Sequence, residues 1–353
     1  MMFLTRRAMG ASSVALLAGC ATGTAATTTE TTAAARAPAA IGAWGVDLAA
    51  RDTSVKPGDD FFKYANGTWL ANTQIPGDRT RWGTFDILRE KADNDARVII
   101  EEVALAGGQP GSNQQKIADF YNSFLNQQQI DAAGLTPLQE ELAQIQALSN
   151  HEQTIRFIAT PGIAVNSPIA VYVGLDDRNP NRYICNMTQA GLGLPEREYY
   201  RRTDGEFPNI RREYEAHITR LLTLAGQSNA GAQARRIVAL ETQIAERHWP
   251  IADRRDRDRT YNLKTRAEIA ALAPRFPWNA SFEAAGLGNV QEVVVAELSA
   301  MGPLANLFIQ TPVSTWKSYL TYHLVRNNAA ILPKNIDDEV FAFYGTTLSR
   351  SEE

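Results

Sequence analysis

Four histidines are present, and their spacing decides whether the chain can form the commonest zinc site of a hydrolase. In the H-E-x-x-H pattern two imidazoles on one helix face bind the metal, and the glutamate activates the bound water. His151 begins a His-Glu pair, but Ile155 occupies the second histidine position. No other histidine is followed by a histidine four positions later. We therefore predict no catalytic and no metal-binding residue, and expect His151 to lie in the polar first turn of a helix after Asn150.

Other reactive patterns are equally incomplete. Glu213 and His217 can share a helix face, but two ligands without a third make a poor metal site, so we expect a surface pair. The sequence has no G-x-S-x-G elbow, phosphate loop or dinucleotide fingerprint. "GLGLP" (residues 191–195) lacks the spacing of a phosphate cradle and predicts a turn. Cys185 lies in the apolar stretch "YICNM", which favours a buried structural thiol.

One stretch, "RTRWGTFDILREKA", combines an arginine and an acid at the start of a predicted helix. The local interpretation is a helix entrance, in which Thr84 caps the helix, Asp86 complements its positive end and Arg81 pairs with Asp86. The alternative is a binding role. An arginine can hold a carboxylate through two hydrogen bonds, and Asp86 could orient that guanidinium. The local residues favour the helix entrance and leave both interpretations open.

The elements that would position these residues are mainly helical. Composition is that of a globular protein, with 44% hydrophobic and 21% charged residues among 353. Net charge is −4 without a basic stripe, so nothing favours nucleic acid. Apolar residues at helical spacing predict helices over 92–105, 112–125, 136–145, 206–224, 230–247, 314–327 and 337–344. Ser112 is expected to cap the second of these, and Thr136 to begin a capping box.

The predicted β-structure is small. Two apolar runs flank a polar turn at residues 176–181, which predicts an antiparallel hairpin, and residues 290–295 resemble another short strand. The run "ADRRDRDR" mixes both signs of charge and is expected to be a solvated linker. The fold class is therefore mainly α with a small antiparallel β-hairpin.

The N-terminus is predicted to be a targeting segment. Residues 1–20 contain a paired arginine, a short apolar stretch and "LAGC", which resembles a bacterial lipoprotein box. The apolar stretch is too short to span a bilayer. We expect lipidation at Cys20 and a membrane anchor through that lipid. Residues 21–43 are rich in alanine and threonine and predict a flexible tether.

Four longer stretches carry a resemblance to a known family. They are "PGDDFFKYANGTWL" (57–70), "IPGDRTRWGTFDILREK" (75–91), "GLGLPEREYY" (191–200) and "FAFYGTTLS" (341–349), with "ALETQIAERHW" and "RDRDRTYN" in order between them. Together they resemble the N-terminal part of the neprilysin and endothelin-converting-enzyme family of zinc metallopeptidases, over roughly residues 47–353. Asn66 stands where animal members carry a disulfide cysteine, which indicates a bacterial-type member.

The resemblance implies a fold and a function. Family members are mainly helical, enclose a chamber between two lobes, and cleave short peptides with one zinc held by H-E-x-x-H and a later glutamate. Those motifs lie C-terminal to the residues here. We therefore expect the N-terminal half of an exported peptidase of the bacterial envelope (periplasm). The missing catalytic half would be its partner and would bind zinc in the full-length enzyme, while this chain alone would bind none and be inactive.

The same resemblance divides the body and assigns a site. Residues 44–92 are expected to pack on the absent catalytic lobe, and residues 93–353 to form the helical lobe. In the family, the arginine and aspartate that match Arg81 and Asp86 line the substrate pocket, so both are expected to contact peptide substrates. The alternative is a non-catalytic envelope lipoprotein that binds peptides or a protein partner.

Overall fold

The structure is a computed structural model that describes residues 47–77, 79 and 81–349. The predictions for the signal segment 1–20, for Cys20 and for the tether 21–43 lie outside these residues. The chain divides into two compact units, one ending at Ile99 and the other beginning at Ile100. No helix in the described part is long and apolar enough to cross a membrane.

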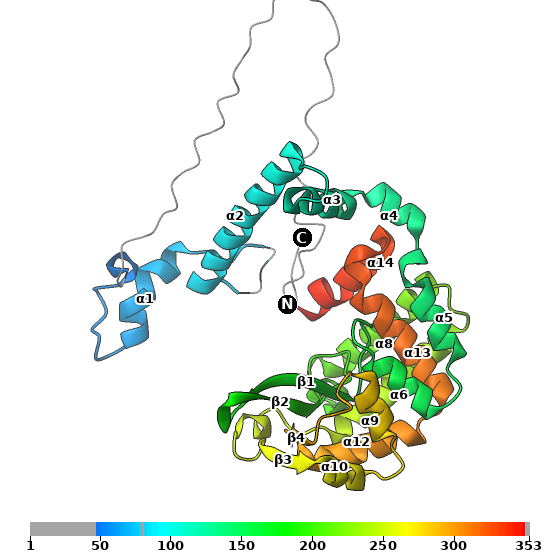
Figure 1. Cartoon of the computed structure of the whole chain (residues 1–353). Coiled ribbons are helices and arrows are strands. Elements are labelled where there is room, and N and C mark those ends of the chain that lie inside the picture. Colours follow the sequence, from blue (N-terminus) through cyan, green and yellow to red (C-terminus); the bar gives the residue numbers. More distant parts are fainter. Residues whose placement is uncertain (1–46, 78, 80, 350–353) are drawn as a thin grey trace, which may run out of the picture. The chain divides into compact units, whose positions relative to one another are not determined.

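The described elements are mainly helical, which confirms the predicted fold class (Figure 1). The helices are α1 (Phe61–Asn72), α2 (Thr84–Ala106), α3 (Asn113–Leu125), α4 (Gln127–Ala133), α5 (Gln139–Ala147), α6 (His151–Ala159), α7 (Glu198–Arg201), α8 (Phe207–Leu224), α9 (Ala230–Arg247), α10 (Arg266–Leu272), α11 (Trp278–Ala284), α12 (Leu298–Gln310), α13 (Val313–Asn327) and α14 (Lys334–Phe341). The strands are β1 (Ile169–Asp176), β2 (Asn179–Gln189), β3 (Asn262–Thr265) and β4 (Glu292–Val295). Short 3₁₀ turns join some of them, and a π-helix, η6 (Ala342–Leu348), follows α14.

The first unit is held together by local hydrogen bonds. The side chain of Asp60 accepts a bond from the Lys63 N–H and caps α1. The Thr68 hydroxyl donates to the Arg51 carbonyl at 2.7 Å, which ties α1 to the segment before it. Helix α1 buries no residue, and neither does α2, which continues into the second unit. Much of the apolar surface of this region is therefore open to solvent.

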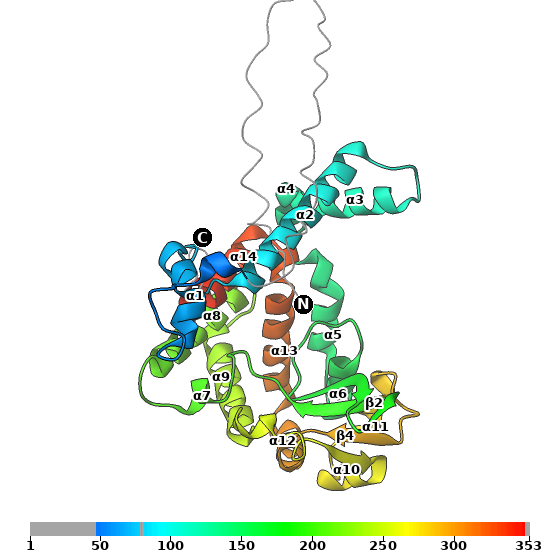
Figure 2. The same cartoon turned by 90° about the vertical axis from the view of Figure 1, so that its left-hand side faces the viewer.

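The second unit is built around α13. In Figure 2 this helix runs between α5 and α9, and it contacts both, together with α8. Ten of its fifteen residues are buried, and they lie on every side of the helix. Several are polar, so their polar atoms need partners inside the protein. Trp316 meets this requirement by donating from its indole to the Phe308 carbonyl at 3.0 Å.

A four-stranded sheet lies at one end of this unit, with the strand order β1-β2-β4-β3 (Figure 1). The predicted hairpin is confirmed, since β1 and β2 pair antiparallel. The prediction of a purely antiparallel part was incomplete, because β2 and β4 pair in parallel and β3 adds a further strand. Cys185 lies on β2 with 3% of its surface exposed, and burial raises the pKa of its thiol to about 11. The predicted burial of this thiol is confirmed.

The structure confirms one of the two predicted helix caps and contradicts the other. Ser112 caps α3 by accepting from the Gln115 N–H, as predicted. The capping box predicted at Thr136 was wrong, because residues 136–138 form a 3₁₀ turn without a side-chain cap. The capping box that exists lies at α10, where Thr265 and Glu268 each accept a hydrogen bond from the backbone N–H of the other.

This contrast gives a matched pair of variants. Thr265→Ala removes a real cap and is expected to lower the free energy of unfolding by about 1 kcal/mol. Thr136→Ala removes a hydroxyl that caps nothing, so a change within about 0.5 kcal/mol is expected. Urea unfolding followed by circular dichroism measures both. Equal losses in the two variants would contradict the assignment of the cap.

Candidate functional site

The predicted substrate-binding pair lies at the start of α2. The Arg81 Nε atom is 3.6 Å from Asp86 Oδ1, and the Arg81 side chain is 80% exposed while that of Asp86 is 24% exposed. Asp86 occupies the first turn of the helix, where a negative charge is favourable. Thr84 is not the cap that we predicted, because the helix begins at Thr84 itself and the Ile87 N–H bonds to the Gly83 carbonyl. The pair thus forms, with the guanidinium largely in solvent.

The histidines do not assemble a metal site. Across the described residues no group of three His, Cys, Asp or Glu side chains could hold a metal ion. His151 begins α6 after the Asn150 cap, as predicted. The expected surface pair of Glu213 and His217 was wrong: His217 is fully buried, and its Nδ1 lies 2.9 Å from Glu339. The apolar stripe of α8 turns His217 inward, where it stacks on Phe343.

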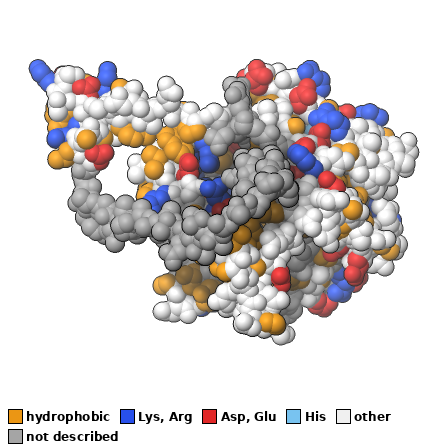
Figure 3. Space-filling view, turned by 90° about the horizontal axis from the view of Figure 1, so that it is seen from above, with side chains coloured by type: hydrophobic (Ala, Val, Ile, Leu, Met, Phe, Trp, Pro, Cys, Tyr) orange, Lys and Arg blue, Asp and Glu red, His pale blue; other side chains and the backbone are white. Residues whose placement is uncertain are grey.

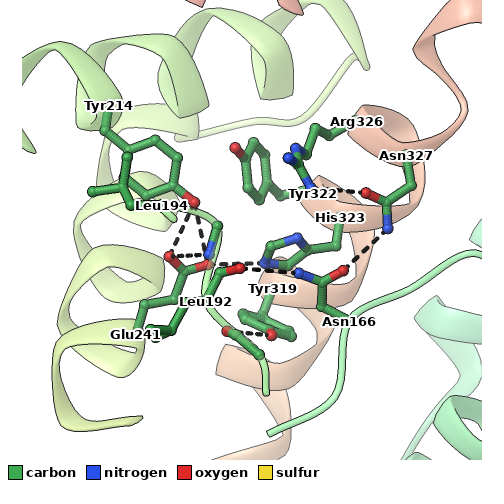
Figure 4. Close-up of polar contacts among 12 residues, drawn as sticks. Asn166, Leu192, Leu194, Tyr214, Glu241, Tyr319, Tyr322, His323, Arg326 and Asn327 are labelled. Atoms are coloured by element: carbon green, nitrogen blue, oxygen red, sulfur yellow. Dashed lines mark hydrogen bonds and ion pairs between the residues drawn. The ribbon is translucent and has the colours of Figure 1, made fainter. Parts of the chain in front are cut away.

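A buried polar site lies instead around residues 191–194, within the predicted turn (Figure 4). This segment is neither helix nor strand, and side chains from other elements hydrogen-bond several of its backbone groups. Its three successive carbonyls accept from Tyr319 Oη at Gly191 (2.7 Å), Asn166 Nδ2 at Leu192 (3.4 Å) and Tyr344 Oη at Gly193 (3.0 Å). Two of its amides also find acceptors: the Leu194 N–H donates to the Tyr200 hydroxyl at 2.9 Å, and the Gly193 N–H donates to Glu241 at 3.2 Å. The segment is therefore fixed without belonging to a sheet.

Glu241 of α9 is the centre of this site. Its side chain is fully buried, and its carboxylate accepts hydrogen bonds from Tyr200 (2.5 Å), Tyr214 (3.0 Å) and the Gly193 N–H (3.2 Å). His323 Nε2 lies 2.8 Å from the other carboxylate oxygen. Because a carboxylate only accepts, His323 must donate from Nε2. A buried carboxylate is costly unless it is paired and hydrogen-bonded, and these four donors meet that requirement.

Burial sets the protonation of the groups around Glu241. It lowers the pKa of His323, although the carboxylate opposes this shift, and it raises the pKa of Tyr200 and Tyr214 well above 10. The histidine is therefore neutral near pH 7, which matches its buried Nδ1 having no hydrogen-bond partner in the described residues. A neutral imidazole and two phenols act here as donors to one carboxylate.

A glutamate beside a histidine could in principle perform acid–base chemistry, but this pair cannot reach a substrate in the structure. Both side chains are fully buried. The hydrogen bonds of Glu241 hold backbone groups instead. Glu241 accepts from the Gly193 amide and from the Tyr200 hydroxyl, and that hydroxyl accepts from the Leu194 amide. The hydrogen bonds of this site therefore position the 191–194 segment.

Sequence reasoning did not find these residues. The signal was present in α9, where Ile237, Leu240, Glu241 and Ile244 lie at helical spacing on one buried stripe. A charged residue on an apolar stripe needs a buried partner, and that requirement could have identified Glu241. His323 and Tyr319 could not be identified in this way. Helix α13 is buried on every side, so a polar residue in it does not stand out from a single apolar stripe.

Comparison with known proteins identifies the fold and the family. The sequence profile described as peptidase family M13 matches residues 57–353. The chain belongs to peptidase family M13. This confirms the resemblance to the neprilysin and endothelin-converting enzymes, and makes the chain a relative of zinc metallopeptidases.

Individual M13 relatives agree. Endothelin-converting enzyme 1 of Rattus norvegicus is 27% identical over 319 residues, covering 85% of this chain and 41% of the relative. The inhibitor complex of the zinc metalloprotease Zmp1 of Mycobacterium tuberculosis is 34% identical with a TM-score of 0.79, covering 87% of this chain and 48% of that one. PepO from Lactobacillus rhamnosis shares the fold, with a TM-score of 0.67 at 16% identity. The chain spans less than half the length of these proteins.

The packing at Gly193 yields a prediction. A Cβ atom there would lie 1.8 Å from Tyr214 Oη and 3.2 Å from Glu241 Oε2, so Gly193→Ala must displace a bonded tyrosine. We expect a loss of at least about 2 kcal/mol in the free energy of unfolding, measured by urea titration. Gly231→Ala in α9 is the control, because a Cβ atom there would meet side chains only at 3.8 Å and beyond. It should leave stability unchanged or raise it by up to about 1 kcal/mol, since alanine favours the helix. Similar effects at both glycines would show that residue 193 is not tightly enclosed.

Proposed function

We propose that this chain is the N-terminal portion of an exported zinc metalloendopeptidase that cleaves short peptides. The observation that carries the proposal is the M13 match over residues 57–353, combined with a sequence that has no H-E-x-x-H motif. In this proposal the zinc is bound by a part of the enzyme outside the sequence given, and the chain supplies the helical lobe. By itself the chain binds no zinc tightly and hydrolyses no peptide.

Exposed apolar side chains support a further part of the proposal, that residues 44–92 pack on the catalytic lobe. Hydrophobic side chains are visible on the surface of the described part in Figure 3. Phe61, Phe62 and Phe85 are 69%, 65% and 88% exposed. Covering one such ring contributes roughly 1.5–3 kcal/mol, so three of them provide a strong reason for a covering partner. The catalytic half is the partner that the family supplies.

Arg81 and Asp86 are proposed to form one wall of the substrate pocket. The exposed guanidinium can reach a ligand, and Asp86 lies close enough to orient it. A peptide with a free C-terminal carboxylate near the cleaved bond matches this group, since the fork of N–H donors binds both carboxylate oxygens. The pair contributes to binding in this proposal and takes no part in bond cleavage.

Export and anchoring complete the proposal. The lipoprotein-type segment and Cys20 would place the enzyme in the bacterial envelope, facing the periplasm, with residues 21–43 as its tether. Mass spectrometry of the envelope-extracted protein tests the anchor, because a lipidated N-terminal cysteine adds the mass of its acyl chains.

The main test concerns the reading frame and the metal. Sequencing downstream of the codon for Glu353 should reveal H-E-x-x-H and a later glutamate in the same frame. The protein that includes them should contain one zinc by metal analysis and cleave short peptides, whereas residues 47–353 alone should contain none. A frame without the motif, or stoichiometric zinc in the shorter protein, would reject the proposal.

Arg81 is tested in the enzyme that includes the catalytic half. Arg81→Ala should raise KM for peptides with a free C-terminal carboxylate, with a loss of about 1–3 kcal/mol in kcat/KM, because a charge-assisted hydrogen bond is removed. The C-terminally amidated peptides should lose much less. Lys91→Ala is the control, since Lys91 lies on the same helix and pairs with Asp95 one turn later. Equal losses on free and amidated peptides would make Arg81 structural.

A further inference from the structure

A pocket of about 560 Å³ lies in the second unit, in front of the segment that Glu241 fixes. It is formed by α6, the start of β1, residues 189–197, the segment after α9, and α11. This volume suits a small ligand of a few residues. The residues 191–194 form part of its wall, so the buried hydrogen bonds behind them also fix the shape of the pocket.

Two arginines line the pocket. Arg197 is only 11% exposed; it donates from Nη1 to the His248 carbonyl at 2.7 Å, and its Nε lies 3.4 Å from the Glu198 carboxylate. Arg254 donates from Nε to Glu297 at 2.8 Å, which orients its guanidinium. Each guanidinium carries five N–H donors, so both keep donors for a ligand.

Both arginines lie near the same histidine, which places their charges at one end of the pocket. His248 also lines the pocket, and burial lowers its pKa to about 4, with Arg254 and Arg197 adding to the shift. His248 is therefore neutral near pH 7 and adds no charge of its own. Glu196 is the one acidic side chain among the lining residues, but Glu198 and Glu297 each pair with one of the two arginines. An anion would therefore be held by the remaining N–H donors of the arginines and not by an excess of positive charge.

The rest of the lining is suited to a peptide. Ile155, Ile158 and Phe282 supply apolar surface beside the charged end. Residues 169–171 of β1 line the pocket in succession, and because successive side chains point to opposite faces, the pocket also touches the strand's backbone. β1 is an edge strand of the sheet. An edge strand can pair with an extended peptide through its free backbone groups.

We propose that this pocket binds the C-terminal end of a short peptide. The free carboxylate is held by Arg197 and Arg254, the apolar last side chain lies against Ile155, Ile158 and Phe282, and the peptide backbone runs along β1. The inference goes beyond the proposed function, because every residue involved belongs to the second unit and neither zinc nor Arg81 is required.

Isothermal titration calorimetry of the full chain tests the inference with three probes. N-acetyl-Ala-Leu carries the free carboxylate, its C-terminal amide lacks the charge, and hexanoate lacks the peptide groups. The free acid should bind, and the amide should bind about tenfold or more weakly. Hexanoate should bind more weakly than the dipeptide acid. No measurable binding of the acid overturns the proposal. If the acid and the amide bind equally, the arginines do not hold the carboxylate and the proposal is overturned. If hexanoate binds as tightly as the dipeptide acid, the pocket is a site for small acids and the proposal of a peptide is overturned.

Variants locate the binding. Arg254→Gln should weaken binding of the acid about tenfold, and Arg255→Gln, at an exposed neighbour outside the pocket, should not. Because Arg254 also pairs with Glu297, a second variant avoids that structural role. Ala159→Phe, at the last residue of α6, should block the pocket, whereas Ala147→Phe, at the exposed last residue of α5, should leave binding intact. Circular dichroism verifies folding of each variant.

Arg81→Ala separates this inference from the proposed function. The variant should bind the dipeptide acid as the unaltered chain does. Loss of binding in Arg81→Ala, or unchanged binding in Ala159→Phe, would assign the peptide to another site and overturn the inference, whatever the downstream reading frame contains.

Discussion

The buried carboxylate of Glu241 is the interaction on which the second unit depends. It lies on the helix α9 and binds donors from residues 193–214 and from α13, so three parts of the chain meet at one charge. A carboxylate removed from water is tolerated only when such donors surround it, and each donor is itself held by packing. The apolar core supplies the free energy of folding, and this charge ties residues 193–214 and α13 to α9 within that core.

The helices and strands could be predicted from the sequence wherever apolar residues recurred at regular spacing and separated a buried side from an exposed side. Helix α9 begins and ends at the predicted residues, and the hairpin was recognised from its two apolar runs. The prediction failed for Thr136, where the letters of a capping box were present but the chain formed a 3₁₀ turn. The parallel pairing of β2 with β4 was also missed, because it joins residues more than one hundred positions apart and leaves no local signal.

The candidate site shows the same limit. Arg81 and Asp86 were found because they lie five residues apart at one helix start, and the structure does bring them within an ion-pair distance. The Glu241 cluster brings together distant segments, and its histidine and tyrosines look like ordinary residues of buried helices. His217 shows how this misleads: its helical neighbour Glu213 was the expected partner, yet burial of the α8 face gave it Glu339 instead. Partners chosen by the tertiary fold cannot be identified by spacing along the chain.

The way residues 191–194 are fixed has a consequence for the order of folding. Gly191 binds a tyrosine 128 residues later, and Gly193 binds one 151 residues later. Bringing such distant segments together costs chain entropy before the contact is formed, so these bonds form late. During synthesis two of its carbonyls, those of Gly191 and Gly193, have no partners until α13 and η6 have left the ribosome. Until then water must satisfy these two groups, and the wall of the pocket in front of them is not yet fixed.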